Sequence, residues 1–164
     1  MLSSSLNIGV DDPIKILFVN PLDSTYAVPR DIPFELTGLA TTADKLGHAV
    51  ELMDLNAHRA DATHQGIKAV LKEDPTEYDL IWFSANYPQF KSMLDAIPVI
   101  RAEQKTAIMA VAGRAATQLP REVHTMSEDI DVVVIGDQED TFREVLERVP
   151  SQRWSNVKGL AYRT

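Results

Sequence analysis

Four polar segments of the sequence carry the side chains best suited to binding or chemistry, and each follows a short apolar run. They combine hydroxyl, carboxamide and carboxylate groups with glycine or proline, a mixture that can surround a polar ligand with hydrogen-bonding groups. Turns favour the same residue types, so a structural role is the simpler interpretation of any single one. The segments are residues 20–26 (NPLDSTY), 84–90 (SANYPQF), 113–117 (GRAAT) and 136–141 (GDQEDT).

Several familiar sites are excluded because the sequence lacks the residues they need. The chain has no cysteine, which removes thiolate nucleophiles, thiolate zinc sites and cysteine-ligated iron–sulfur clusters. Neither G-x-G-x-x-G nor the P-loop motif occurs, so a glycine-lined diphosphate site is unsupported. The four histidines form no helical i, i+4 pair and no H-x-E metal motif. Ser84 and Gly136 stand where a two-component receiver needs Asp and Lys.

The elements that must position these segments are indicated by the apolar runs that precede them. Residues 14–19, 79–83 and 131–135 are continuously apolar and too short for typical helices, which predicts interior parallel strands. Residues 49–53 and 106–111 are weaker strands, and residues 157–162 are expected to form an edge strand. These runs predict a mainly parallel sheet of five or six strands.

Helical spacing fills the intervals between the expected strands. Leu36, Leu39, Ala43 and Leu46 share one helix face, with Gly47 as a natural end. Similar patterns occupy residues 67–71, 90–97, 119–126 and 142–149, and Pro98 is expected to kink or shorten the second of these. The alternation predicts a flavodoxin-like, Rossmann-like, three-layer α/β/α fold with strand order 2-1-3-4-5. A ligand crevice is then expected at the carboxyl ends of strands 1 and 3.

Length, charge and hydropathy limit the organisation and the partners. A chain of 164 residues supports one core, so we expect a flexible N-terminal segment at 1–13 and a single domain at 14–164. The net charge of −8 disfavours nucleic acid and anionic membrane surfaces as partners. No apolar stretch approaches the roughly 20 residues that cross a bilayer, and no signal peptide is visible, so a cytoplasmic location is expected.

Five segments of the sequence resemble one known family in their order and spacing. The resemblance extends over nearly the whole chain. The family is the N-terminal cobalamin-binding domain of cobalamin-dependent radical S-adenosylmethionine proteins. The closing residues 157–163 (VKGLAYR) also resemble the strand that leads toward the catalytic barrel of such proteins. The five segments are residues 15–21 (KILFVNP), 29–34 (PRDIPF), 47–54 (GHAVELMD), 78–85 (YDLIWFSA) and 129–136 (DIDVVVIG).

The resemblance implies that cobalamin, the cobalt-containing vitamin B12 cofactor, lies across the carboxyl edge of the sheet. The nucleotide tail would lie beside Ser84, Ala85, Gly113, Arg114, Gly136, Asp137 and Glu139, and the corrin would face Asp23, Ser24, Tyr26, Tyr87 and Gln89.

Three departures from the family pattern affect these implied sites. The Asp-x-His-x-x-Gly motif that supplies a lower axial ligand is replaced by residues 23–26 (DSTY), so the resemblance implies cobalamin without an axial histidine from the protein. The strand 4 loop, often Gly-Gly-x-His-Ala-Thr, reads AGRAAT at 112–117. The acidic loop, often Gly-Glu-Gly-Glu, reads GDQE at 136–139 and lacks its second glycine.

The absence of cysteine also bears on activity. Radical S-adenosylmethionine enzymes hold a [4Fe–4S] cluster on three cysteines, so this chain cannot perform that chemistry alone. A radical S-adenosylmethionine domain or subunit carrying the iron–sulfur cluster is the expected partner, in a methyltransferase or a related enzyme. Two alternatives stay open: a degenerate relative that binds no cobalamin and acts as a protein-interaction or regulatory module, and a protein that binds a nucleotide or flavin at the same edge.

Overall fold

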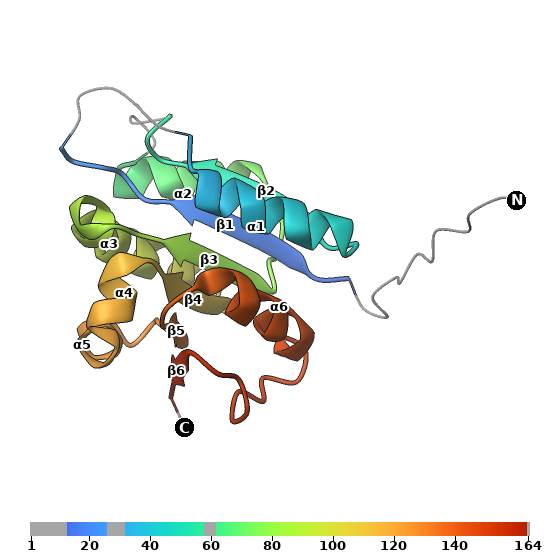
Figure 1. The fold of residues 1–164 in the computed structure, drawn as a ribbon. Coiled ribbons are helices and arrows are strands. Elements are labelled where there is room, and N and C mark those ends of the chain that lie inside the picture. The colour runs from blue at the N-terminus through green and yellow to red at the C-terminus, as the bar shows by residue number, and fades with distance from the viewer. Residues whose placement is uncertain (1–12, 26–31, 58–61, 164) are drawn as a thin grey trace, which may run out of the picture.

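The computed structural model describes residues 13–25, 32–57 and 62–163, and in them strands and helices alternate along the chain (Figure 1). The predicted alternation is therefore confirmed. The strands are β1 (Lys15–Asn20), β2 (Ala49–Asp54), β3 (Leu80–Ser84), β4 (Ile108–Ala112), β5 (Val132–Val134) and β6 (Leu160–Tyr162). The helices are α1 (Phe34–Lys45), α2 (His64–Glu73), α3 (Tyr87–Glu103), α4 (Arg114–Gln118), α5 (Pro120–Met126) and α6 (Gln138–Arg148).

The six strands form one sheet in the order β2-β1-β3-β4-β5-β6. Strands β1 to β5 pair in parallel, and β6 joins β5 in the antiparallel direction. The predicted flavodoxin-like order 2-1-3-4-5 is confirmed, as is the edge position of the last strand. The winding reverses between β1 and β3, because β2 lies on one side of β1 and the later strands on the other.

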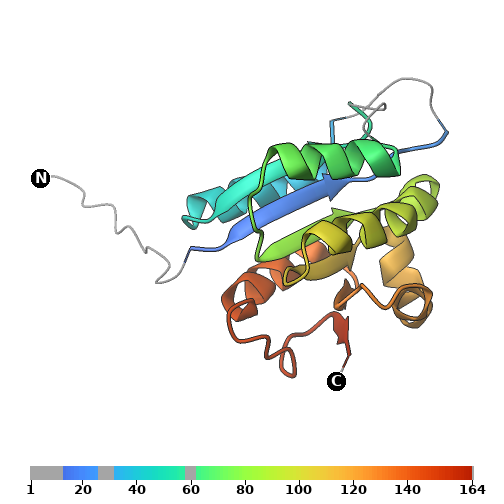
Figure 2. The ribbon, with the colours of Figure 1, turned by 180° about the vertical axis from the view of Figure 1, so that it is seen from behind.

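Helices cover both faces of the sheet, with α1 and α6 on one face and α2 and α3 on the other (Figures 1 and 2). Side chains of a strand alternate between these faces, so Trp82 packs toward α6 while its neighbour Phe83 packs on the opposite side. The Trp82 ring meets the ring of Phe142 edge-on, with centroids 4.9 Å apart. Two buried clusters therefore hold one three-layer fold together.

Local signals explain most of the helix ends, and packing explains why α3 runs past Pro98. Helix α1 stops before Gly47, whose φ of 94° suits glycine. The side chain of Asp137 accepts the backbone N–H of Glu139 and begins α6. Of the two effects expected of Pro98, a kink or a shorter helix, shortening does not occur, since α3 continues to Glu103. A proline removes only one backbone donor, and Met93, Ile97 and Ile100 are fully buried along α3, so packing holds the helix together.

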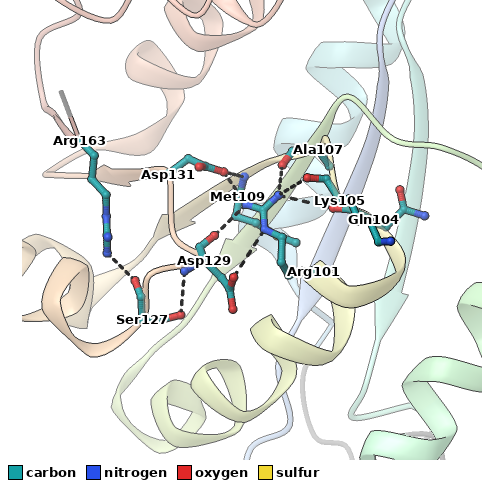
Figure 3. Close-up of polar contacts among 9 residues, drawn as sticks. All are labelled: Arg101, Gln104, Lys105, Ala107, Met109, Ser127, Asp129, Asp131 and Arg163. Carbon is teal, nitrogen blue, oxygen red and sulfur yellow. Dashed lines mark hydrogen bonds and ion pairs between the residues drawn. The ribbon is translucent and has the colours of Figure 1, made fainter.

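At the amino edge of the sheet, Arg101 of α3 joins the starts of β4 and β5 (Figure 3). Its guanidinium donates to the Ala107 carbonyl at 2.6 Å, to the Asp129 carbonyl at 2.8 Å and to Asp131 Oδ2 at 2.6 Å. The same Asp131 oxygen accepts the backbone N–H of Met109 at 2.8 Å. This arginine therefore fixes the ends of two strands far from the polar loops.

The structure bears only in part on two expectations, the flexible N-terminal segment with its domain limits and the lack of a membrane-spanning stretch. Residues 1–12 lie outside the described residues, so the flexible N-terminal segment and the domain limits stay predictions. None of the helices in the described ranges is long and apolar enough to pass through a bilayer.

Candidate functional site

The loops after β1, β3, β4 and β5 meet at one edge of the sheet, because parallel strands present their carboxyl ends on the same side. This is the edge where ligands of open α/β sheets bind. The polar segments singled out in the sequence are therefore brought together, except Tyr26, which lies outside the described residues.

The junction between β1 and β3 is bridged by Gln89. Its Nε2 donates to Asn20 Oδ1 and to the Pro21 carbonyl, both at 2.9 Å, and its Oε1 accepts the backbone N–H of Asn86 at 3.1 Å. Both ends of the carboxamide are thus engaged by the two loops. Gln89 therefore holds the β1 and β3 loops together.

The loop after β1 is also tied to its neighbours on both sides. The backbone N–H of Asp23 donates to Asn56 Oδ1 at 2.7 Å, and Asn56 Nδ2 donates to the Pro21 carbonyl at 2.8 Å. Ser24 Oγ donates to the Pro88 carbonyl at 3.3 Å, which links this loop to the start of α3. Hydrogen bonds to the segments on both sides therefore hold Asp23 and Ser24 in place.

A cavity of about 350 Å³ opens beside this junction, between α1 and the loops after β3, β4 and β5. Its volume is at the lower end of the range found for small-molecule pockets. The cavity lies beside the junction of β1 and β3, at the loops of strands 3, 4 and 5 where the resemblance implies the nucleotide tail. Five of the predicted site residues line it, namely Gly113, Arg114, Gly136, Asp137 and Glu139, together with Glu35, Leu39, Asn86, Thr117, Gln118 and Gln138.

Two predicted glycines at this edge differ in what surrounds them. A Cβ on Gly113 (φ 103°) would lie 2.4 Å from the Ala85 carbonyl oxygen, so this glycine lets the β3 and β4 loops pack together. A Cβ on Gly136 (φ 86°) would meet no atom within 4 Å. The Gly136 backbone N–H donates to Thr117 Oγ1 at 3.1 Å, which joins the last two loops of the cavity. Of the two, only Gly136 leaves open space at the cavity.

Under the cavity, three side chains form a hydrogen-bonded cluster that we call the polar floor: Glu35, Ser84 and Gln138. Ser84 Oγ donates to Glu35 Oε2 at 3.1 Å, and Gln138 Nε2 donates to the same oxygen at 3.0 Å and to Ser84 Oγ at 3.4 Å. Gln138 Oε1 accepts the indole N–H of the fully buried Trp82 at 3.2 Å. The floor therefore joins α1, β3 and α6.

The sequence named Ser84 as a candidate site residue and included Gln138 in the loop expected along the nucleotide, but it did not single out Glu35. Gln138 stands where the family pattern has its second glycine, and that substitution was the available signal. Glu35 had no comparable signal, because only the packing of α1 against the sheet brings its carboxylate to Ser84. The hydroxyl of Tyr87 donates to Gln118 Oε1 across the mouth of the cavity.

No histidine lies among the described residues that line the cavity. His48 lies at the opposite edge, where its Nδ1 accepts the backbone N–H of Ile14 at 3.3 Å and burial lowers its pKa. The described residues also include no cluster of three or more His, Cys, Asp or Glu side chains able to hold a metal ion. The described lining of the cavity therefore supplies hydrogen-bonding groups and charged side chains, with no histidine among them.

A second, smaller cavity of about 180 Å³ lies between β2 and α2, away from the polar loops. It is mostly apolar, with Tyr78 and Glu51 at its polar end joined by a hydrogen bond of 2.5 Å. Burial and this bond raise the pKa of Tyr78. Its residues include none of the predicted site residues.

Comparison with known proteins places these features in a family. The family model described as B12 binding domain matches residues 32–146, which contain α1 and the loops after β3, β4 and β5. A search of curated protein sequences gave no match.

Solved structures with a similar fold include the cobalamin-dependent S-adenosylmethionine radical enzyme OxsB with aqua-cobalamin bound, at a TM-score of 0.75 and 18% identity. A second OxsB structure, with aqua-cobalamin and S-adenosylmethionine, has a TM-score of 0.71 and 18% identity. In each, the match covers 92% of this chain and 21% of the enzyme, so this chain spans about a fifth of its length. The family match covers more than half of the chain, and the chain therefore belongs to the B12-binding domain family, as its sequence predicted.

Proposed function

We propose that this chain binds cobalamin across the carboxyl edge of its sheet, with the nucleotide in the cavity and the corrin over the loops after β1 and β3. The observation that carries the proposal is that the family match includes the three loops that build the cavity. In this arrangement Ser84, Ala85, Gly113, Arg114, Gly136, Asp137 and Glu139 lie near the nucleotide, and Asp23, Ser24, Tyr87 and Gln89 lie near the corrin.

The residues present fit a cobalamin that receives no lower axial ligand from the protein. Gly136 leaves open space at the cavity, and the polar floor offers hydrogen-bonding groups beneath it. The described lining includes no histidine to coordinate cobalt. When bound, cobalamin supplies methyl transfer or radical chemistry at cobalt, and the chain contributes binding and orientation.

The chain would work with a radical S-adenosylmethionine domain or subunit, in a methyltransferase or a related enzyme. Because the sequence has no cysteine, the iron–sulfur cluster of such an enzyme must come from that partner. The fold shared with a cobalamin-dependent radical enzyme supports this assignment.

Equilibrium dialysis of the full chain against hydroxocobalamin, with absorbance spectra of the bound fraction, tests the binding proposal. We expect saturable binding of one corrinoid per chain and a shift of the cobalamin spectrum on binding. Absence of retained corrinoid would overturn the proposal and favour the non-binding alternative, in which Gln138 fills the tail position and the domain acts as an interaction module.

A further inference from the structure

The polar floor has an unusual balance of donors and acceptors. The indole N–H of Trp82, the amide hydrogens of Gln138 and the hydroxyl hydrogen of Ser84 are all directed to acceptors inside the cluster. Among the described residues, no donor reaches Glu35 Oε1. The floor therefore presents the cavity with an unused carboxylate oxygen and with no unused donor.

If a neutral nitrogenous base lay against the polar floor, the lone pair of its ring nitrogen would face the unused oxygen of Glu35. Both atoms are hydrogen-bond acceptors. Ser84 is only 8% exposed, and its single proton is held by Glu35 at 3.1 Å. Two acceptors facing each other leave both without a partner once the bound base shields them from water, which costs free energy. A base that carries an extra proton has the N–H that the unused oxygen can accept, and the resulting bond is charge-assisted.

The charges around the cavity also favour a cation, on balance. The charged side chains of the described lining are Glu35 on α1, Arg114 on α4, Asp137 at the start of α6 and Glu139 on α6. Three are acidic and one is basic. Glu35 belongs to the polar floor and is itself exposed, as are Asp137 and Glu139.

Resting on the proposed function, we propose that Glu35 selects the corrinoid nucleotide in its protonated form, by accepting a hydrogen bond from the N–H of the base. Ser84 and Gln138 position the carboxylate for this contact. Binding of cobalamin then takes up one proton from solvent, and that proton neutralises part of the negative charge of the cavity.

Because binding takes up a proton, the affinity for cobalamin should depend on pH. A corrinoid without the base should not show this dependence. We expect the dissociation constant of hydroxocobalamin to rise about tenfold per pH unit between about pH 6 and pH 8, as uptake of one proton requires. Cobinamide, a corrinoid without the nucleotide, serves as the probe that lacks the base. Its dissociation constant is expected to stay constant over the same range, which also controls for titration of the protein.

The variant Glu35→Gln tests the residue itself. Glutamine keeps the size of the side chain and can donate to a neutral base, so the dependence of cobalamin affinity on pH should disappear. At about pH 6 the variant should bind cobalamin at least tenfold more weakly than the wild type, with cobinamide unchanged. The matched control is Asp44→Asn, which makes the same charge change at the exposed far end of α1 and should keep the wild-type pH dependence.

The outcomes separate this inference from the proposed function. If neither corrinoid binds the wild type, the proposed function fails. If both bind and the affinity for cobalamin follows that for cobinamide at every pH, cobalamin binding stands and the role of Glu35 is overturned. A Glu35→Gln variant that keeps the wild-type pH dependence, with an unchanged circular dichroism spectrum, also overturns it.

Discussion

Gln138 occupies the loop position at which the family pattern has a glycine, and its side chain both closes the cavity floor and satisfies a buried tryptophan. The indole of Trp82 is fully buried, so its N–H depends on Gln138 Oε1 for a partner. This glutamine thus has a structural role that is separable from any ligand.

Replacing Gln138 with leucine should lower the free energy of unfolding by about 1–3 kcal/mol, because it leaves the buried indole N–H without an acceptor. Gln138→Glu keeps an acceptor at the same distance and should lose less. Urea unfolding followed by tryptophan fluorescence measures both variants. Equal stability of the leucine variant and the wild type would contradict the role assigned to this bond.

Gly136→Val should weaken cobalamin binding by at least tenfold, because the side chain enters the open space at the cavity and the backbone has a positive φ. Gly47→Val is the matched control, since Gly47 also has a positive φ and open surroundings but lies away from the cavity. Dialysis against hydroxocobalamin gives both affinities. Similar losses in the two variants would show that backbone strain alone is responsible.

The sequence proposed candidate site residues, and the structure adds what each one contacts. Gly136 lies at the cavity and Ser84 in the polar floor. The bridge made by Gln89 was not predictable, because a polar residue in a loop can equally face a ligand or join two loops, and only the coordinates show that both ends of its carboxamide are engaged. The close approach of the Ala85 backbone to Gly113 was likewise visible only in the structure.

Among the elements, the strands were easier to predict than the helices. Strands β1, β3 and β5 are buried on both faces and therefore read as continuous apolar runs. Helix α3 is longer than its apolar spacing indicated, since Pro98 interrupts the pattern without interrupting the packing. The link between α3 and the strand ends also escaped prediction, because Arg101 and Asp131 lie 30 residues apart.

Arg101→Met should lower the free energy of unfolding by about 2–3 kcal/mol, because it removes charge-assisted bonds to Asp131 and to two carbonyl groups while keeping the apolar stem. The control is Lys91→Met on the same helix, whose bond to Asp95 is exposed and should contribute less than about 1 kcal/mol. Chemical denaturation compares them. Equal losses would show that the guanidinium contacts contribute little.

The described residues place the polar loops and the cavity at one edge of the sheet, and the ion pairs of Arg101 at the other. The fold class and strand order were predictable, because alternating strands and helices with right-handed crossovers leave few arrangements. The resemblance implied a crevice at the loops of strands 3, 4 and 5, where the cavity lies. The part that α1 and the side chain of Gln138 take in its wall was not predictable, since it depends on how these helices cover one face of the sheet.

Cobalamin should stabilise the whole domain, because a ligand that binds only the folded state shifts the unfolding equilibrium. At a hydroxocobalamin concentration about 100 times the dissociation constant, we expect a gain of about 2.7 kcal/mol in the free energy of unfolding. Thermal unfolding by circular dichroism measures it, with Gly136→Val as the variant that should gain less. An unfolding temperature that does not respond to the corrinoid would argue against binding to the native fold.

The loops around the cavity are held together unequally, because the bridge made by Gln89 joins only the loops on one side. The loops after β1, β2 and β3 are joined through Gln89 and Asn56, whereas the described contact between the loops after β4 and β5 is one bond from Gly136 to Thr117 Oγ1. A corrinoid of a different size would therefore be accommodated by movement of the loops after β4 and β5. Amide hydrogen exchange should accordingly be faster at Gly136 than at Asp23, even before any cofactor arrives.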